Sequence, residues 1–143
     1  MPGLRKRFHI KAKDFAKAGE GSLAVQSLLK SIGFDPGLVR RVSICAYEAE
    51  MNVVMHGGDG VLILTVDPRK IVLDFKDEGP GIENVELALQ EGYTTAAPEY
   101  REMGFGAGMG LPNIKKNADS LKIHSGKGNG THLEISITVR EMS

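Results

Sequence analysis

Residues 48–57 read EAEMNVVMHG, and the interpretation of the whole chain starts from this stretch. Glu48 and Asn52 are four positions apart, so on a helix both side chains lie on one face, with His56 about one turn further along. A carboxylate can act as a general base, and an amide oxygen can ligate a hard cation such as Mg²⁺. The same pair is also typical of a solvated helix face, and a histidine near a helix C-terminus is commonly a dipole or capping partner.

This stretch ends the longest periodic segment of the sequence. Asp35 is the expected N-cap and Pro36 the first residue of a helix that runs to about Met55. A helix over residues 22–32 precedes it and stops at Gly33. The apolar positions of the longer helix are expected in the core, with the cysteine a small buried hydrophobe; they are Val42, Cys45, Ala46, Ala49 and Val53.

The remaining segments predict a sheet with helices on one side. The expected strands are residues 4–13, 60–66, 71–77, 120–125 and 131–139, of which the middle two form a hairpin and the last two a closing hairpin. Between the hairpins, the sequence favours a short helical segment over 84–90, a polar loop over 92–103 and a helix over 111–121. Helices and hairpins without regular alternation predict one α+β domain over residues 1–143.

Composition narrows the class of protein. The chain has 143 residues, 41% of them hydrophobic and 25% charged, which is typical of one globular domain. Lys and Arg number 18 and so do Asp and Glu, so the net charge is zero and nucleic-acid binding is disfavoured. The single cysteine and the lack of a long apolar run favour a cytoplasmic protein without a signal peptide or membrane span.

A second motif, DEGPGI at residues 77–82, directly follows a predicted strand. Its glycines let the backbone bend and let a ligand approach closely. The Asp77 carboxylate can accept a hydrogen bond from an exocyclic amine of the kind that adenine offers. An ordinary turn is the alternative, because the motif is rich in turn-forming residues.

A third motif, GFGAGMGL at residues 104–111, leads into a predicted helix. Amides exposed by glycines, together with a helix N-terminus, suit a phosphate group. No Gly-Lys-Ser/Thr follows, so the motif is not a P-loop, and a polar loop rather than a strand precedes it, unlike a dinucleotide-binding fingerprint. A flexible linker is the alternative, although linkers seldom run straight into an amphipathic helix.

The order and spacing of the three motifs, followed by Gly130-Thr131 on the last strand, resemble the GHKL ATPase superfamily. The resemblance extends from about residue 5 to 139 and implies the Bergerat ATP-binding fold, a two-layer α/β sandwich with a mostly antiparallel mixed sheet covered on one face by helices. Within the superfamily the chain is most similar to bacterial anti-sigma factor serine/threonine kinases, through residues 48–57 and the lid-like segment 94–101. The glycine run is more similar to that of stress-signalling kinases of the same group. A chain of this length is not expected to be a complete sensor histidine kinase.

The resemblance implies a role for each motif residue. Asn52 would hold Mg²⁺, and Glu48 would be the general base that takes a proton from an acceptor hydroxyl or orients a water. Asp77 would bind the adenine amine, and Thr131 would support it through a hydrogen bond. Arg101 would contact the terminal phosphate, where a cation stabilises the charge of phosphoryl transfer.

Further positions complete the implied ATP site. Gly79 and Gly81 would make room for the adenine ring. The residues that would wrap the phosphates are Gly106, Gly108, Met109, Gly110 and Leu111. The other nucleotide contacts expected from the resemblance are His56, Ile82, Thr95, Gly104 and Ala107.

Three functions remain open from the sequence. The first is an ATP- and Mg²⁺-dependent kinase that phosphorylates Ser or Thr of a small anti-anti-sigma (STAS-type) partner and also binds a sigma factor. The second is a binding module whose partner affinity depends on the bound nucleotide, and the third is an ATPase that needs a partner chain for any output. Family resemblance also suggests a homodimer that uses the first strand and first helix.

Overall fold

The computed structural model describes residues 3–56, 58–79, 89–90, 110–125 and 130–140. Five strands form one sheet in the order β1-β2-β3-β5-β4. Their bounds are β1 Leu4–Ile10, β2 Gly60–Val66, β3 Lys70–Asp77, β4 Ser120–Ser125 and β5 Thr131–Thr138. All four pairings between these strands are antiparallel, which agrees with the expected mostly antiparallel sheet.

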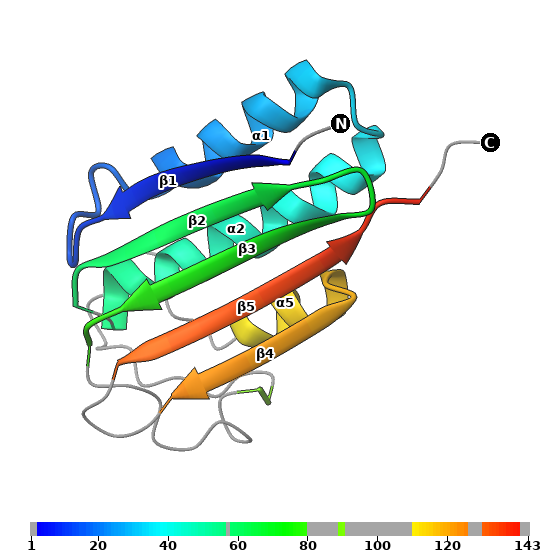
Figure 1. Cartoon of the computed structure of the whole chain (residues 1–143). Helices are drawn as coiled ribbons and strands as arrows, with labels where there is room; N and C mark the ends of the chain where they lie inside the picture. Colours follow the sequence, from blue (N-terminus) through cyan, green and yellow to red (C-terminus); the bar gives the residue numbers. More distant parts are fainter. Residues whose placement is uncertain (1–2, 57, 80–88, 91–109, 126–129, 141–143) are drawn as a thin grey trace.

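Three described helices cover one face of this sheet (Figure 1). They are α1 Glu20–Ile32, α2 Pro36–His56 and α5 Gly110–Asn117. The other face of the sheet carries no described helix, so the fold is a two-layer α+β sandwich of the expected type.

The predicted cap of the long helix is present. The Asp35 carboxylate accepts hydrogen bonds from the backbone N–H groups of Gly37 and Leu38, at 3.0 and 3.2 Å, and so satisfies two amides of the first turn of α2. Gly33 ends α1 with a φ of 99° and donates its N–H to the carbonyls of Leu29 and Lys30. These two caps fix the connection that brings α2 back alongside α1.

Three element boundaries differ from the sequence prediction. β1 ends at Ile10 rather than residue 13, because the chain turns away and the Lys13 N–H donates to the Val54 carbonyl of α2 at 2.8 Å. α1 begins at Glu20, two residues earlier than predicted. α5 ends at Asn117 rather than residue 121, because β4 begins at Ser120. The expected helical segment over 84–90 falls mostly outside the described residues, and the expected loop over 92–103 lies wholly outside them.

The core lies between the helices and the covered face of the sheet. Val42, Cys45, Ala46, Ala49 and Val53 are all buried in it, as predicted. Burial raises the pKa of the Cys45 thiol to about 12, so this cysteine is an inert core residue rather than a reactive thiol.

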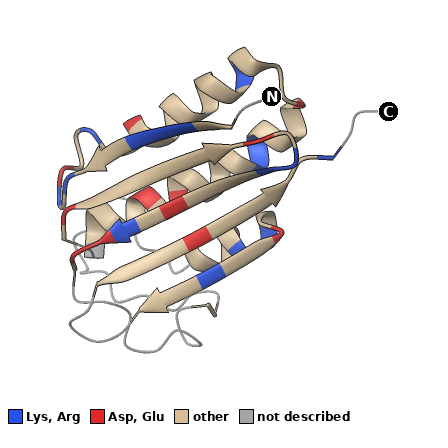
Figure 2. Cartoon of the chain, in the orientation of Figure 1, with Lys and Arg blue, Asp and Glu red and all other residues tan. Residues whose placement is uncertain are grey.

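Charge is unevenly distributed over the sheet. Figure 2 shows a basic stretch on the edge strand β1, which is Arg5 to Arg7 in the sequence. Charged side chains on an edge strand discourage sheet-to-sheet aggregation.

Among the described residues, none of the helices combines the length and apolar character that a membrane crossing requires.

Candidate functional site

Three residues predicted for the site come together between α2 and α5. Glu48 and Asn52 lie one turn apart on α2, and Gly110 begins α5. A Cβ atom built on Gly110 would lie 3.3 Å from Oδ1 of Asn52 and 3.5 Å from Oε2 of Glu48. The structure therefore brings the carboxylate and amide of the first motif against the end of the glycine motif.

Packing of α5 on α2 holds this arrangement. Arg41 donates from Nε to the carbonyl of Asn117 at 2.9 Å and pairs with Asp119 at 3.2 Å, which fixes the C-terminal end of α5. Ile114 of α5 is fully buried, and its carbonyl accepts the weak hydrogen bond of the Cys45 thiol at 3.7 Å. The start of α5 is thereby directed at the face of α2 that carries Glu48 and Asn52.

The Glu48 carboxyl group is half-buried, and burial raises its pKa above the ordinary value for glutamate. A hydrogen bond from the Asn113 side chain acts in the opposite direction and lowers the pKa. A carboxylate whose pKa is raised toward neutrality is a better general base than an ordinary glutamate. Asn113 was not predicted from the sequence; its position three residues after Gly110, about one helical turn on, is the signal that could have identified it.

A second cluster forms where β3 ends. Asp77 pairs in register with Thr131 of β5, which pairs in turn with Ser125 of β4. The Asp77 carboxylate accepts the backbone N–H of Gly79 at 2.8 Å, and the hydroxyl groups of Thr131 and Ser125 are 2.9 Å apart. Burial raises the pKa of Asp77, while hydrogen bonds from the backbones of Gly79 and Thr131 lower it. The structure thus places Asp77 beside Thr131, as expected for a shared adenine subsite, and adds Ser125.

Glycine is required at one position beside Asp77. Gly130 has a φ of 72°, in the region that side chains rarely adopt, and a Cβ there would collide with the Asp77 carbonyl oxygen. The β5 backbone can approach the end of β3 this closely only because residue 130 has no side chain.

The first cluster is formed by Glu48, Asn52 and Gly110, and the second by Asp77, Thr131 and Ser125. The two clusters lie at the same end of the molecule. The C-terminal end of α2, the end of β3 and the start of β5 are found together in Figure 1. Gly60 connects the clusters, because it pairs with Asp77 and a Cβ built on it would lie 3.0 Å from Cγ1 of Val53, the residue after Asn52. Both clusters therefore belong to the same end of the fold.

Other predicted residues contribute less or cannot be placed. The Leu111 side chain is buried in the core, so only its backbone is free to face a phosphate. His56 is the last residue of α2, and its side chain is not described. The predicted residues outside the described part of the chain are Gly81, Ile82, Thr95, Arg101, Gly104, Gly106, Ala107, Gly108 and Met109.

The first cluster fits a magnesium–phosphate group. Asn52 supplies one amide oxygen next to a position where the absence of a side chain leaves space. Mg²⁺ prefers oxygen ligands, keeps several waters and is commonly held by one or two protein groups together with substrate phosphates. Within the described ranges, no group of three or more His, Cys, Asp or Glu side chains could hold a metal ion by itself. A metal here would therefore depend on the phosphates of a nucleotide.

Comparison with protein families adds independent information. Residues 13–137 match the model of the histidine kinase-like ATPase domain. The chain is 30% identical over 142 residues to the anti-sigma F factor of Clostridium kluyveri, covering 94% of this chain and 96% of that protein. It is 32% identical over 106 residues to the anti-sigma F factor of Clostridium acetobutylicum, covering 69% and 71% of the two chains.

Two further similarities extend the comparison. The serine/threonine-protein kinase RsbT of Bacillus subtilis is 23% identical over 113 residues, covering 76% of this chain and 79% of that one. Among solved structures, a mycobacterial sensor histidine kinase, MprB, superposes with a TM-score of 0.55 at 16% identity, covering 97% of this chain and 100% of the other. At this identity the structural likeness supports the fold.

Proposed function

This chain belongs to the histidine kinase-like ATPase family, and from that premise we propose that it is an anti-sigma regulatory factor with protein serine/threonine kinase activity. It transfers the γ-phosphate of ATP to a Ser or Thr of a small anti-anti-sigma partner of the STAS type. Relatives named anti-sigma F factor and serine/threonine-protein kinase support both parts of the proposal.

One observation carries the proposal. Glu48 and Asn52 converge on Gly110 at the start of α5, where a built Cβ would lie 3.5 Å from Oε2 of Glu48 and 3.3 Å from Oδ1 of Asn52. A general base, a hard-cation ligand and a helix N-terminus that favours phosphate then meet at one point. The Asp77–Thr131 pair lies at the same end of the molecule and suits the adenine ring.

In the proposed reaction, the acceptor hydroxyl oxygen forms a bond to the γ-phosphorus while the bond from that phosphorus to the β–γ bridging oxygen breaks. ADP leaves, and the hydroxyl proton passes to the Glu48 carboxylate. Mg²⁺ bound with the nucleotide would supply positive charge to the phosphates, and Asn52 is the residue that would hold it. Asn113 orients the Glu48 carboxylate through its hydrogen bond.

Transfer of labelled phosphate tests this function directly. The chain is incubated with Mg²⁺ and γ-labelled ATP in a lysate of its source organism, and proteins carrying acid-stable label are separated on a gel. We expect one small labelled protein that is lost with Asn52→Ala. Asn117→Ala is the matched control, because Asn117 lies at the far end of α5 and, in the described part of the chain, its side chain donates to the Asn113 carbonyl of the same helix.

The alternative outcomes are distinct. No labelled protein, together with intact ATP binding, contradicts the kinase and favours a binding module whose partner affinity depends on the nucleotide. A labelled protein that persists in Asn52→Ala contradicts the assignment of Asn52. Sensitivity of the label to acid would indicate a phosphohistidine rather than a phosphoserine or phosphothreonine.

A further inference from the structure

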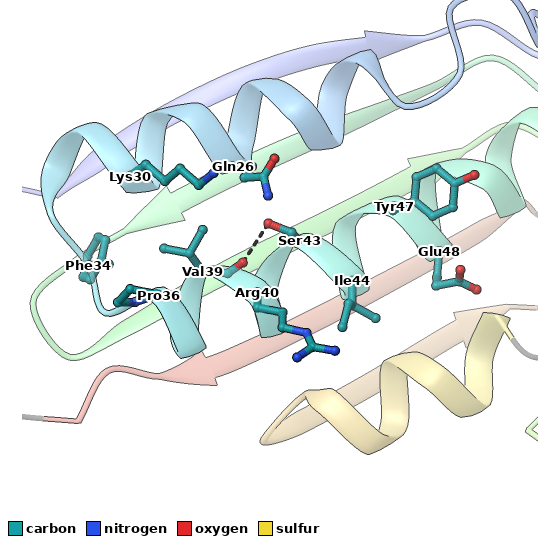
Figure 3. A pocket seen from close by; sticks show the side chains of 10 residues that line it. All are labelled: Gln26, Lys30, Phe34, Pro36, Val39, Arg40, Ser43, Ile44, Tyr47 and Glu48. Atoms are coloured by element: carbon teal, nitrogen blue, oxygen red, sulfur yellow. Dashed lines mark hydrogen bonds between the residues drawn. The ribbon is translucent and has the colours of Figure 1, made fainter.

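A groove runs along the outer surface of α2 and ends at the proposed base. It has a volume of about 720 Å³ and is lined by side chains of α1, of the α1–α2 connection and of α2, Glu48 among them. Figure 3 shows Gln26 and Lys30 pointing from α1 toward α2, and Glu48 at the opposite end of the groove from Phe34. The groove therefore leads to the carboxylate from the side of the α1–α2 connection.

The side chains that line the groove change from basic to apolar to acidic along α2. Arg40, Ile44 and Glu48 are spaced four residues apart, so they form one stripe on the helix. The stripe begins with a cation, continues with an apolar side chain and ends with the proposed base. Lys30 of α1 adds a second cation at the end away from Glu48.

Exposed apolar side chains mark the same surface. Within the described part of the chain, the large hydrophobic residues that are most exposed are Leu23, Ile32 and Tyr47, and all three belong to α1 or α2. Tyr47 is 43% exposed and lines the groove. Leu23, at 62% exposed, is three and seven residues from Gln26 and Lys30 and so lies on the same side of α1. Clustered exposed hydrophobic residues are a common sign of a protein-binding surface.

We propose that this groove is the docking site for the segment that carries the acceptor hydroxyl, and that the segment is acidic and amphipathic. An acidic side chain of the segment pairs with Arg40, an apolar one lies against Ile44 and Tyr47, and the acceptor Ser or Thr reaches Glu48. The proposal rests on the kinase function proposed above and adds the chemistry of the substrate segment to it.

Helix geometry sets the spacing that the segment should have. Eight residues separate Arg40 from Glu48, which corresponds to about 12 Å at about 1.5 Å per residue. An extended chain covers about 3.3 Å per residue, so the acid should lie about four residues from the acceptor hydroxyl. A segment with the acid adjacent to the hydroxyl cannot engage both ends of the groove in an extended conformation.

Binding can be measured without any phosphate transfer. The ¹⁵N-labelled chain is titrated with a ten-residue peptide that contains one Ser, a Glu four residues away and a Leu between them. A matched peptide has Lys in place of Glu. We expect amide shifts at Gln26, Ile44 and Tyr47 with the Glu peptide, and at least about fivefold weaker binding of the Lys peptide. Equal affinity for the two peptides, shifts confined to other surfaces, or no shifts at millimolar peptide would each overturn the proposal.

A charge-reversal pair relates the groove to catalysis. Arg40→Glu should weaken the peptide at least about fivefold and raise the KM for the labelled acceptor protein about tenfold, with ATP affinity unchanged. Lys122→Glu is the matched control, since Lys122 is exposed on the edge strand β4, away from the groove, and should change neither value. If the acceptor is phosphorylated equally well by Arg40→Glu, the docking proposal is wrong while the kinase function stands. If the Glu peptide binds in the groove but nothing is phosphorylated, the kinase function is wrong while the docking surface stands.

Discussion

Glu48 and Glu50 are two residues apart on α2, and the structure gives their carboxylates opposite environments. Glu50 is 3% exposed and accepts backbone N–H groups from Gly19, Gly21 and Ser22 at 3.0, 3.2 and 2.9 Å. Glu48 is half-buried beside Asn113 and Gly110, and burial raises its pKa.

The two environments suit two different roles on one helix: one carboxylate stabilises the fold and the other suits proton transfer. A buried carboxylate that receives three amide donors at a helix N-terminus has its desolvation offset by charge-assisted hydrogen bonds. A carboxylate that is partly desolvated with fewer donors is left more basic, which costs stability and suits proton transfer. Glu50 therefore joins α1 to α2, and Glu48 is left for the proton transfer that we propose.

The sharpest test of the comparison is Glu48→Gln. We expect phosphate transfer to fall by about 10²- to 10⁴-fold, because the variant cannot accept the hydroxyl proton, while ATP still binds. The rate is measured with labelled ATP and the acceptor protein under single-turnover conditions. Glu134→Gln, on β5, is the matched control and should retain the wild-type rate. Transfer that is unchanged in Glu48→Gln would remove Glu48 as the base.

The converse test is Glu50→Ala. Removing the carboxylate leaves three amides without their acceptor at the start of α1, and the expected loss of unfolding free energy is about 3 kcal/mol. Urea unfolding followed by circular dichroism measures this loss. For the fraction that remains folded, the transfer rate per molecule should change far less than in Glu48→Gln. A loss below about 1 kcal/mol would show that water replaces the carboxylate as the acceptor.

The same pair shows what the sequence could and could not predict. Glu48 and Asn52 were identified because their four-residue spacing can be read directly from the sequence. Asp35 was identified as a cap because the backbone N–H groups that it accepts belong to residues two and three positions later. Glu50 was missed because its donors are 28 to 31 residues away in the chain. The predicted start of α1 was two residues late for the same reason, since backbone N–H groups at its N-terminus donate to the Glu50 side chain of α2.

The candidate site also combines residues that a local motif predicts with residues whose partners are distant in the sequence. The order of the motifs was enough to predict that Glu48, Asn52, Asp77, Gly110 and Thr131 share a function, and the described structure brings them to one end of the molecule. Asn113 and Ser125 were not predicted, because each acts through a partner from another element; the spacing of Asn113 from Gly110 was its one local signal. The α1–α2 groove was missed because it depends on how two helices pack.

A smaller effect, on ATP affinity, is expected from a substitution of Gly110, the first residue of α5. In Gly110→Ala, the new Cβ would lie 3.3 Å from Oδ1 of Asn52, closer than ordinary van der Waals contact. We expect about a tenfold loss of ATP affinity, because the methyl group enters the space assigned to the phosphates. Isothermal titration with Mg²⁺-ATP measures it. Gly3→Ala is the control, because a Cβ there would lie 3.4 Å from the Val66 carbonyl oxygen, which is ordinary van der Waals contact.

The Asn113 hydrogen bond can be tested through pH. It lowers the pKa of Glu48, so Asn113→Ala should let that pKa rise further. Because the base must be deprotonated, transfer should increase with pH through the Glu48 pKa, and this acidic limb should move to higher pH in the variant. The limb is measured from kcat/KM as a function of pH with the acceptor protein. A limb that stays in place would show that another group is titrating.

The smallest expected effect concerns the stability that Glu48 costs. The pKa of its carboxyl group is raised in the folded state, so folding favours the protonated form, and stability falls as pH rises from the unfolded-state pKa through the folded-state value. At neutral pH the ionised carboxylate bears this cost in full, and Glu48→Gln removes it. We therefore expect the variant to have a higher Tm than the wild type at pH 7, with a gain in stability of less than about 1 kcal/mol because solvent screens the half-exposed carboxylate. Below the ordinary pKa of glutamate the two proteins should melt together, since Glu48 is then protonated in both states. A variant that is less stable than the wild type at pH 7 would mean that Glu48, like Glu50, stabilises the fold, and the contrast between the two carboxylates would be lost.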